Sequence, residues 1–373
     1  MRYYVIAGET SGDLHGSNLI TALKEQDPPA EFRVVGGDLM ERTSGQRAVL
    51  HTSQMSFMGF VEILSNLNTI RKNLKLVKKD LIQYMPDCLI LIDFPGFNLR
   101  IADFAKRHNL FVCYYISPKV WAWNEKRVLK VKALVDRMFC ILPFEKEFYA
   151  KWGMQVDYVG NPLLDELSRF SPEKNFIHKH KLGLKPLIAL LPGSRKMEIK
   201  KLLPGMAAMQ DHFPEYQFVI AGAPNFTSVY YQKVLKGRTD IPIVFGATYD
   251  LLSNAQAALV ASGTATLETA LLRVPEVVVY KAHWLSVWLA KRLVRVKYIS
   301  LVNLIMDLMI VRELIQEDFN EQAVKQELGL LLNDTSYREN MLQNYEGLHQ
   351  KMGGPGSSDR TAKLIITALG ERI

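Results

Sequence analysis

The sequence predicts an α/β protein of two doubly wound, Rossmann-like domains that face each other across a cleft. Its 373 residues exceed the roughly 250–300 residues at which one hydrophobic core stops growing. Short apolar runs alternate with stretches of helical spacing, which is typical of parallel sheets with crossover helices. This series restarts after a polar, charged segment at 165–185. Ligands of such sheets bind at the carboxyl ends of the strands, so functional residues are expected there.

Apolar runs rich in β-branched residues predict five strands in each half. In the first half we expect strands at 3–7, 32–36, 88–92, 111–115 and 138–142. In the second half we expect them at 187–191, 217–221, 242–245, 257–261 and 276–280. The predicted organisation is an N-terminal domain (1–164), a linker (165–185) and a C-terminal domain (186–352). A final helix at 357–373 follows a glycine-rich hinge and packs either on the first domain or on a partner subunit.

Composition and charge narrow the functional classes. The net charge of +8 and the pI near 9.2 favour phosphate-bearing ligands or an anionic membrane. Nucleic acid is not expected, because no helix–turn–helix, zinc-finger or aromatic RNA-binding pattern is present. The three cysteines lack paired or metal-like spacing, so we expect buried thiols, no metal and no cofactor. Without a signal sequence or a long apolar run, the expected location is cytoplasmic or peripheral on the cytosolic face.

The first predicted strand runs into a glycine-rich turn, AGETSGD (7–13). Gly8 and Gly12 permit a tight turn and a close approach of a ligand to backbone amides. The pattern is neither the dinucleotide fingerprint nor the P-loop. It is either a ligand-binding turn or a plain strand-to-helix turn capped by Ser11 or Asp13.

Asp93 stands directly after the apolar strand 88–92 and before a Pro-Gly turn. A carboxylate at this position can accept the proton of an attacking hydroxyl, or orient that hydroxyl. The alternative is a helix cap, but Asn98 is better placed for capping, so a functional role is favoured for Asp93. The nearby segment SPKVWAW (117–123) places two tryptophans in a loop, either to contact sugar or acyl groups or to close the base of the domain.

The second half opens with a turn that suits a diphosphate, LLPGSR (190–195). Gly193 and Ser194 lead into a helix N-terminus, where free amides and the positive end of the dipole favour anions. Arg195 adds a fork of donors for phosphate oxygens. Stabilising a departing diphosphate is what a sugar transfer requires most.

A second turn, ASGTATLE (261–268), has the same character. Ser262, Gly263 and Thr264 are small residues that let phosphates approach backbone amides at a helix start. Glu268 lies one turn into the helix, where a carboxylate can hold both ribose hydroxyls. An acid that merely stabilises the first turn of its helix is the alternative.

Two apolar stretches edged by basic residues suit the surface of an anionic membrane. Their apolar residues are Met58, Phe60, Val61, Ile63, Leu64, Leu67, Trp284 and Trp288. Amphipathic helices that face a protein core are the alternative explanation.

In combination, these segments resemble the lipid-A-disaccharide synthases, inverting bacterial glycosyltransferases of the GT-B fold. The matching segments are AGETSGD (7–13), MGFVEIL (58–64), IDFPGFN (92–98), SPKVWAW (117–123), LPFEKEFY (142–149), VGNPL (159–163), LLPGSR (190–195), ASGTATLE (261–268), LAKRLV (289–294), YISLVN (298–303) and ELIQE (313–317). They occur in this order over nearly the whole chain, and their combination is specific even where single segments are weak.

The resemblance implies a reaction between two lipids. UDP-2,3-diacylglucosamine would donate its sugar to the 6-hydroxyl of 2,3-diacylglucosamine 1-phosphate, giving a β-1,6 disaccharide and UDP, without metal or cofactor. It implies that Asp93 is a general base and that Arg195 binds the donor phosphates. It further implies that the UDP is held by Glu268, Asn303 and Gln316. Acceptor contacts are expected from Gly8, Glu9, Ser11, Gly12, Asp13 and Asn98. A peripheral place on the inner membrane and homodimers that exchange C-terminal segments are also implied.

Two departures from the family pattern stand out. Relatives often carry a second acid at the position of Gly96, and a proline at the position of Val302. Rival functions are another UDP-sugar enzyme of the same fold, such as an N-acetylglucosamine transferase or a 2-epimerase, and a non-catalytic lipid or nucleotide carrier. An epimerase would need no lipid patch, and a carrier would tolerate loss of Asp93.

Overall fold

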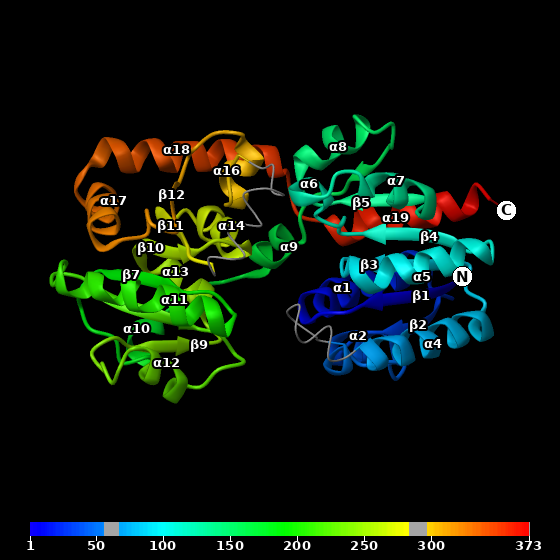
Figure 1. Ribbon diagram of the computed structural model, residues 1–373, viewed down its shortest axis with the longest axis horizontal. Coiled ribbons are helices and arrows are strands. Elements are labelled where there is room, and N and C mark those ends of the chain that lie inside the picture. Colours follow the sequence, from blue (N-terminus) through cyan, green and yellow to red (C-terminus); the bar gives the residue numbers. More distant parts are fainter. Residues whose placement is uncertain (56–66, 283–296, 373) are drawn as a thin grey trace. The chain divides into compact units, whose positions relative to one another are not determined.

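The computed structural model describes residues 1–55, 67–282 and 297–372, which form two compact α/β units (Figure 1). The first unit comprises Met1–Ser168 and the segment that starts at Gly354, and the second comprises Arg169–Gly353. Each unit has a six-stranded parallel sheet with crossover helices, so the predicted fold class is confirmed. Nearly all strand residues are buried, as expected for parallel sheets that are covered on both faces.

The first sheet has the strand order β2-β1-β3-β4-β5-β6. Its strands are β1 (Arg2–Ala7), β2 (Glu31–Val35), β3 (Cys88–Ile92), β4 (Phe111–Tyr115), β5 (Arg137–Cys140) and β6 (Asp157–Tyr158). The described helices of this unit are α1 (Thr10–Gln26), α2 (Asp38–Ser44), η1 (Thr52–Gln54), α4 (Leu67–Tyr84), α5 (Pro95–Arg107), α6 (Val120–Trp123), α7 (Arg127–Leu134), α8 (Pro143–Ala150), α9 (Pro162–Arg169) and α19 (Ser357–Gly370).

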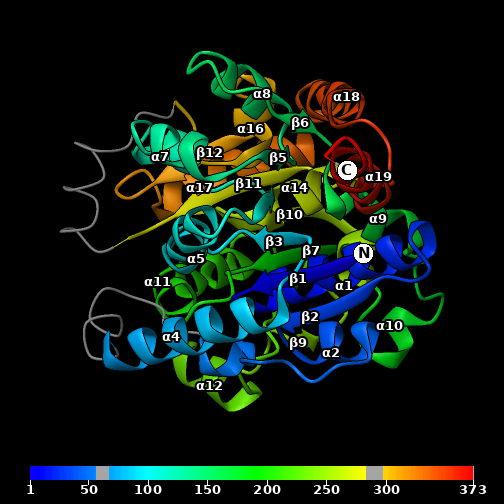
Figure 2. The same cartoon turned by 90° about the vertical axis from the view of Figure 1, so that its right-hand side faces the viewer.

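Two apolar layers enclose this sheet. One face packs on α1, α2 and α19, and the other packs on α4, α5 and α7. Figure 2 shows α1 and α19 on one side of the sheet and α4 and α5 on the other. The last helix therefore returns to the first unit of its own chain, where α19 lies against α1.

The second sheet has the strand order β12-β11-β10-β7-β8-β9. Its strands are β7 (Leu187–Leu191), β8 (Gln217–Gly222), β9 (Ile243–Phe245), β10 (Ala255–Ala261), β11 (Glu276–Tyr280) and β12 (Arg312–Ile315). The described helices are α10 (Phe176–Lys179), α11 (Lys196–Ala207), η2 (Ala208–Asp211), α12 (Ser228–Val234), α13 (Thr248–Ser253), α14 (Thr264–Leu271), α16 (Leu301–Met306), α17 (Glu321–Asn333) and α18 (Thr335–Met352).

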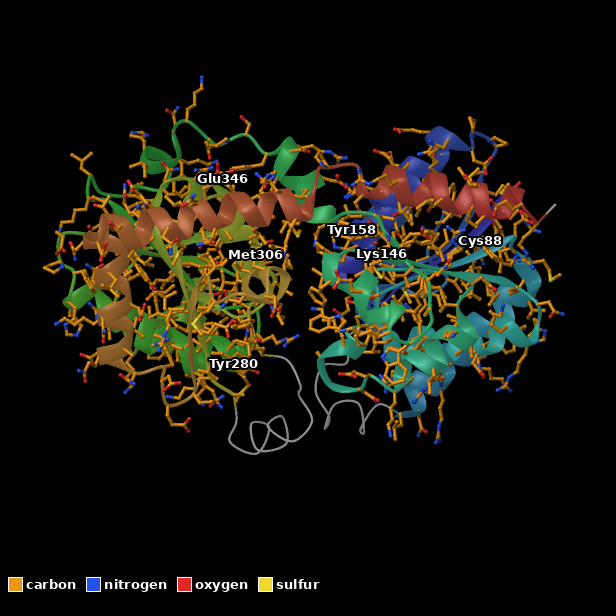
Figure 3. The ribbon with its side chains drawn as sticks, turned by 90° about the horizontal axis from the view of Figure 1, so that it is seen from above. Cys88, Lys146, Tyr158, Tyr280, Met306 and Glu346 are labelled. Carbon is orange, nitrogen blue, oxygen red and sulfur yellow. The ribbon has the colours of Figure 1, made fainter. Side chains whose placement is uncertain are left out.

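Helices again cover both faces of this sheet. Residues of α10 and α13 join one apolar cluster with the strands, while α11 and α17 contact the strands from the other side. The long helix α18 packs on α16. Met306 at the end of α16 lies beside Gly347, next to Glu346 in the middle of α18 (Figure 3). No helix in the described ranges is both long enough and apolar enough to cross a bilayer.

The structure differs from the sequence-based expectations in three places. The strands β6 and β12 were not expected, because they are short and carry charged residues. The division between the units falls after Ser168, and Phe176 and Leu182 belong to the second core. Much of the expected linker 165–185 is therefore a folded part of the second unit.

Candidate active site

In the first sheet, the carboxyl ends of β1 and β3 lie side by side. Ala7 is paired with Ile92, and from these two strands the sheet continues in opposite directions, to β2 and to β4. Such a switch point leaves a crevice at the carboxyl edge, which is where open α/β sheets bind ligands. Gly8 and Glu9 follow β1 at this edge, and Asp93 follows β3.

Asp93 sits on an unusual backbone. Its φ is +42° and that of Phe94 is +46°, a left-handed region that costs residues other than glycine of order 1–3 kcal/mol each. The carbonyl of Asp93 accepts hydrogen bonds from the Tyr114 hydroxyl at 2.5 Å and the Asn98 amide at 2.8 Å. Its N–H donates to the carbonyl of Tyr115 at 3.1 Å. These bonds hold the strained turn.

The surroundings raise the pKa of the Asp93 carboxyl above its ordinary value. Burial is the largest cause, and the charge of Glu9 adds to it. Lys119 and the backbone N–H of Phe94 act in the opposite direction. A carboxylate with a raised pKa is a better proton acceptor than an exposed one.

Gly8 and Gly96 flank this turn and have opposite environments. A Cβ atom on Gly8 would lie 2.2 Å from Cδ1 of Phe94, so the ring can occupy its place only because residue 8 has no side chain. A Cβ on Gly96 would meet no atom within 4 Å. The position at which the family resemblance implies a second acid is therefore open to a larger side chain.

Two of the expected acceptor contacts have internal partners instead. The carboxylate of Asp13 accepts backbone N–H bonds at the start of α2: one oxygen accepts from Gly37 at 2.7 Å and Met40 at 3.0 Å, and the other accepts from Leu39 at 3.1 Å. Asp13 thus caps α2, and we do not retain it as an acceptor contact. The Asn98 amide donates to the carbonyls of Ile92 and Asp93, so Asn98 supports the turn at Asp93 rather than standing free.

The other first-unit candidates differ in their exposure. Ser11 is exposed and Glu9 is half-buried. Gly12 is buried, and a Cβ atom at this position would lie 3.2 Å from the Cβ of Ala7. The Nδ1 of His15 is buried without a hydrogen-bond partner among the described residues. Burial lowers the pKa of His15 to about 4, so this imidazole is neutral at physiological pH.

A buried carboxylate that the sequence did not single out holds the loop after β4. Glu145 is 1% exposed and accepts hydrogen bonds from the Ser117 hydroxyl at 2.5 Å and the Trp121 indole at 3.1 Å. Trp121 in turn stacks edge-on against Phe144. These contacts resolve the two alternatives for Trp121: it closes the inside of the loop and is not displayed to a ligand.

The second sheet has an equivalent switch point between β7 and β10. Leu191 is paired with Val260, so the turns 192–195 and 262–264 follow neighbouring strand ends. Gly193 has φ +94°, and a Cβ there would lie 2.4 Å from a carboxylate oxygen of Glu198. The side chain of Arg195 is 70% exposed and reaches Glu198 only at 3.4 Å. This turn therefore presents an accessible guanidinium beside the N-terminus of α11.

The turn before α14 is equally accessible. Gly263 and Thr264 are exposed, while the Ser262 hydroxyl donates to the carbonyl of Ile299 at 2.9 Å. Glu268 is half-buried, and one of its oxygens accepts a hydrogen bond from the Tyr249 hydroxyl at 3.2 Å.

Asn303 is buried, and its side-chain amide is fully engaged in internal hydrogen bonds. Its amide donates to Val311 and to the Glu313 carboxylate, and its side-chain oxygen accepts from the N–H groups of Ile310 and Val311. Glu313 also accepts from the N–H of Ser300 at 2.9 Å. The asparagine expected to hold UDP thus braces the loop before β12, together with Glu313, which the sequence did not single out.

Gln316 directly follows β12 and combines two features of a ligand-binding residue. Its φ is +58°, and its N–H donates to the carbonyl of Tyr280 at 2.8 Å. Its side-chain Nε2 is buried and has no hydrogen-bond partner within the described ranges. A buried donor without a partner is costly, and a bound ligand would satisfy it.

Most of the expected lipid patch falls outside the described residues, namely Met58, Phe60, Val61, Ile63, Leu64, Trp284 and Trp288. Leu67 begins α4 and is 37% exposed. The same helix exposes Arg71, Lys72, Lys75 and Lys79.

Solved structures with the same architecture include sugar-nucleotide enzymes. A UDP-GlcNAc 2-epimerase from Neisseria meningitidis, bound to UDP-GlcNAc, matches with a TM-score of 0.68 at 14% identity over 100% of both chains. The S. aureus MnaA–UDP co-structure matches with a TM-score of 0.71 at 14% identity, over 99% of this chain and 97% of that one. A glycotransferase of kitacinnamycin matches with a TM-score of 0.69 at 12% identity, over 99% of both. These likenesses place the chain in the GT-B fold class.

Sequence comparison gives the family within that class. The family described as Lipid-A-disaccharide synthetase matches residues 3–364. The lipid-A-disaccharide synthase of Geobacter sulfurreducens is 35% identical over 380 residues, covering 100% of this chain and 98% of that protein. The enzyme of Trichlorobacter lovleyi is 37% identical over 378 residues, covering 98% and 97%. The chain belongs to the lipid-A-disaccharide synthase family, and it is a UDP-sugar glycosyltransferase of lipid A biosynthesis.

Proposed function

We propose that this enzyme transfers 2,3-diacylglucosamine from UDP-2,3-diacylglucosamine to the 6-hydroxyl of 2,3-diacylglucosamine 1-phosphate. The observation that carries the proposal is the buried, strained Asp93 at the first switch point of a chain that belongs to this family. The products are a β-1,6 disaccharide 1-phosphate and UDP. The specific lipids follow from the family, whereas the chemistry follows from the site.

The reaction is a single displacement. The acceptor O6 attacks the anomeric carbon of the donor, and the proton of that hydroxyl passes to the Asp93 carboxylate. The bond between the anomeric carbon and the phosphate oxygen breaks, and its electron pair leaves with UDP. One displacement inverts the anomeric centre. Asp93 must be ionised to accept the proton, so activity rises with pH through the pKa of its carboxyl group.

The second unit supplies the stabilisation of the leaving group. Arg195 and the amides of the Gly193–Ser194 turn face developing negative charge at the N-terminus of α11. The exposed turn Gly263–Thr264 offers a second set of amides at α14. Glu268 binds the ribose hydroxyls, and the Nε2 of Gln316 binds a UDP oxygen. Two observations support this assignment: the guanidinium of Arg195 is exposed, and the Nε2 of Gln316 is a buried donor without a hydrogen-bond partner among the described residues.

Acceptor contacts are assigned to the first switch point. Glu9 and Ser11 follow β1 beside Asp93, and the backbone amides at Gly8 and Gly12 line the same edge of the sheet. Glu9 and Ser11 are among the side chains of this turn that remain accessible. We assign them to hydrogen bonds with the acceptor sugar.

We further propose that the enzyme works at an anionic membrane surface on the cytosolic side. The exposed basic residues of α4 lie directly after the apolar stretch 58–67, and a basic residue near such a surface contributes about 1 kcal/mol. Vesicles with and without phosphatidylglycerol test this by flotation. Lys72→Glu, Lys75→Glu and Lys79→Glu together should abolish binding to the anionic vesicles. The control, Lys200→Glu, Lys325→Glu and Lys363→Glu, changes net charge equally and should bind better than the α4 variant.

The reaction itself is tested with the two purified lipids in detergent. UDP and disaccharide are followed by mass spectrometry in the presence of a chelator. Disaccharide formation by the wild type, and its loss in Asp93→Ala, supports the proposal. Binding of UDP without disaccharide formation would contradict it and would direct attention to other acceptors.

A further inference from the structure

The loop between β4 and α6 displays one cation at the edge that carries Asp93. Tyr115, the last residue of β4, is paired with Ile92 of β3, so Lys119 follows a strand end that is level with that of Asp93. Lys119 is exposed. Its charge reaches Asp93, where it opposes the effect of burial on the carboxyl group. It forms no ion pair with any carboxylate in the part of the chain that the structure describes.

The backbone on both sides of Lys119 is fixed. Ile116 has φ +64°, a rare conformation for a β-branched residue, and its N–H donates to the carbonyl of Phe139 at 3.0 Å. Ser117 and Trp121 are both bonded to the buried Glu145 carboxylate. The ammonium group of Lys119 thus extends into solvent from a rigid backbone segment. This rigidity lowers the entropic cost of binding an anion there.

The charges around Asp93 create a need for such a cation. Glu9 and Asp93 are both acidic, and a phosphate monoester carries about −1.5 to −2 charge at neutral pH. Bringing this phosphate to the edge would be opposed by two carboxylates and would hinder ionisation of the base. In a pyranose, the C1 phosphate and the C6 hydroxyl flank the ring oxygen and project from the same edge of the sugar. An acceptor whose O6 meets Asp93 therefore brings its phosphate close to the same loop.

We propose that Lys119 binds the C1 phosphate of the acceptor and thereby makes the enzyme select a phosphorylated acceptor. This inference rests on the proposed function and names the group that reads one feature of its substrate. The ammonium pairs with phosphate oxygens through charge-assisted hydrogen bonds. It also keeps the Asp93 carboxylate ionised while the dianion is bound.

The test compares two acceptors, 2,3-diacylglucosamine with and without its 1-phosphate. In Lys119→Met the KM for the phosphorylated acceptor should rise by about tenfold or more, as for the loss of one hydrogen bond between charged groups. The KM for the UDP-sugar should stay unchanged, and the preference for the phosphorylated acceptor should fall by the same factor. Lys119→Arg should restore most of this preference. Lys130→Met, at an exposed position on α7, should behave like the wild type.

The outcomes separate this inference from the proposed function. An active wild type with an unchanged phosphate preference in Lys119→Met would overturn the inference alone. A second result would also overturn the inference: a lower kcat and a displaced pH profile in Lys119→Met, with the full preference for the phosphorylated acceptor retained. Lys119 would then act only through the charge of Asp93, as Glu9 and the Tyr114 hydroxyl also do. A wild type that makes no disaccharide would overturn the proposed function, and this inference with it.

Discussion

The two switch-point edges are built in opposite ways. At the edge of the first sheet, the carboxyl group of Asp93 is buried and its backbone is strained, and the backbone carbonyl of this residue accepts hydrogen bonds from Tyr114 and Asn98. At the edge of the second sheet, Arg195 is 70% exposed and the turn at Gly263 is open. A proton acceptor must be desolvated and oriented before the substrate arrives. A cradle for a diphosphate needs free amides and a mobile cation, which the ligand itself then orders.

Replacing the base should give the largest effect. Asp93→Asn keeps the shape of the side chain but removes the proton acceptor, so kcat should fall by roughly 10²- to 10⁴-fold. UDP binding, measured by calorimetry, should stay unchanged. Asp103→Asn is the matched control: Asp103 lies on α5 in an exposed ion pair with Arg107, and its loss should leave kcat within about twofold. Near-normal turnover of Asp93→Asn would exclude the general-base role.

The second edge should respond differently. Arg195→Ala should lower kcat by roughly 10²-fold, because in the proposed mechanism the guanidinium stabilises charge that develops on the leaving UDP. Folding should be little affected, since the contact of Arg195 with Glu198 is long and exposed. Lys200→Ala, an exposed change on the same helix, is the control for both thermal melting and steady-state kinetics. If the variant binds the donor more weakly but keeps its kcat, Arg195 stabilises the bound donor and the transition state equally.

The fold could be predicted further than the site. Ten strand positions were recognisable, because strands buried on both faces read as continuous apolar runs. The positions of Asp93 and of the glycine turns also followed from the sequence, because strand ends are local features. Whether a polar side chain is available to a ligand or is engaged in internal hydrogen bonds was not predictable, because that depends on partners far away in the sequence. Asp13 is consumed by amides 24 and more residues away, and Asn303 by a loop that ends at Glu313. Glu145 was missed for the same reason.

The two glycines beside Asp93 allow a sharper test of the first edge. Gly8→Ala should destabilise the protein by about 1–3 kcal/mol, because its methyl group overlaps the Phe94 ring. Turnover should fall with it, since Phe94 adjoins the base. Gly96→Ala meets open space and should stabilise by up to about 1 kcal/mol in the first turn of α5. Urea unfolding measures the change in the free energy of unfolding for each variant. If the two variants change it equally, the packing of Phe94 does not constrain the turn.

A smaller effect is expected from restoring the acid that relatives carry. In Gly96→Asp the new carboxylate has room and stands three residues after Asp93, so its negative charge should raise the pKa of the Asp93 carboxyl further. The acid limb of kcat/KM should then move to higher pH, and added salt should reduce the displacement. Gly96→Asn supplies the same shape without charge and should leave the profile in place. An increase in the maximal rate of Gly96→Asp, with no displacement, would indicate that the second acid acts on the substrate directly.

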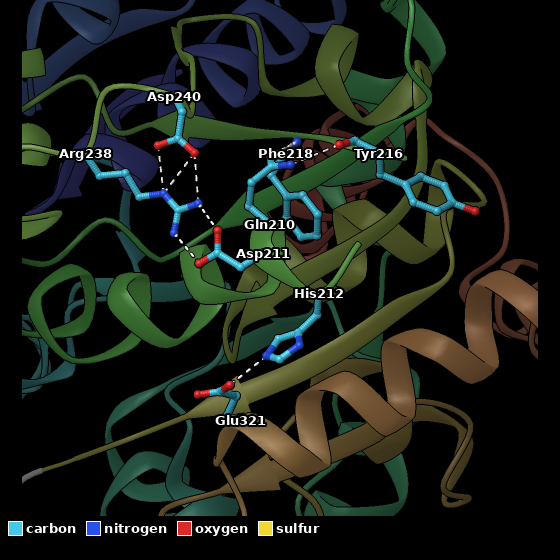
Figure 4. A network of polar contacts seen from close by, with 8 residues as sticks. All are labelled: Gln210, Asp211, His212, Tyr216, Phe218, Arg238, Asp240 and Glu321. Atoms are coloured by element: carbon cyan, nitrogen blue, oxygen red, sulfur yellow. Dashed lines mark hydrogen bonds and ion pairs between the residues drawn. The ribbon is translucent and has the colours of Figure 1, made fainter. Parts of the chain in front are cut away.

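The smallest effect is expected away from both edges. Arg238 bridges Asp211 and Asp240 (Figure 4). These residues lie in the segments that lead into β8 and β9, at the opposite ends of the strands from Arg195. The side chains of Asp211 and Asp240 are half exposed or more, so water and salt screen this network. Arg238→Gln should lower the melting temperature by a few degrees at most, less so in high salt, and leave kcat and both KM values unchanged. A catalytic defect here would mean that function is not confined to the carboxyl ends of the strands, and the contrast between the two edges would lose its basis.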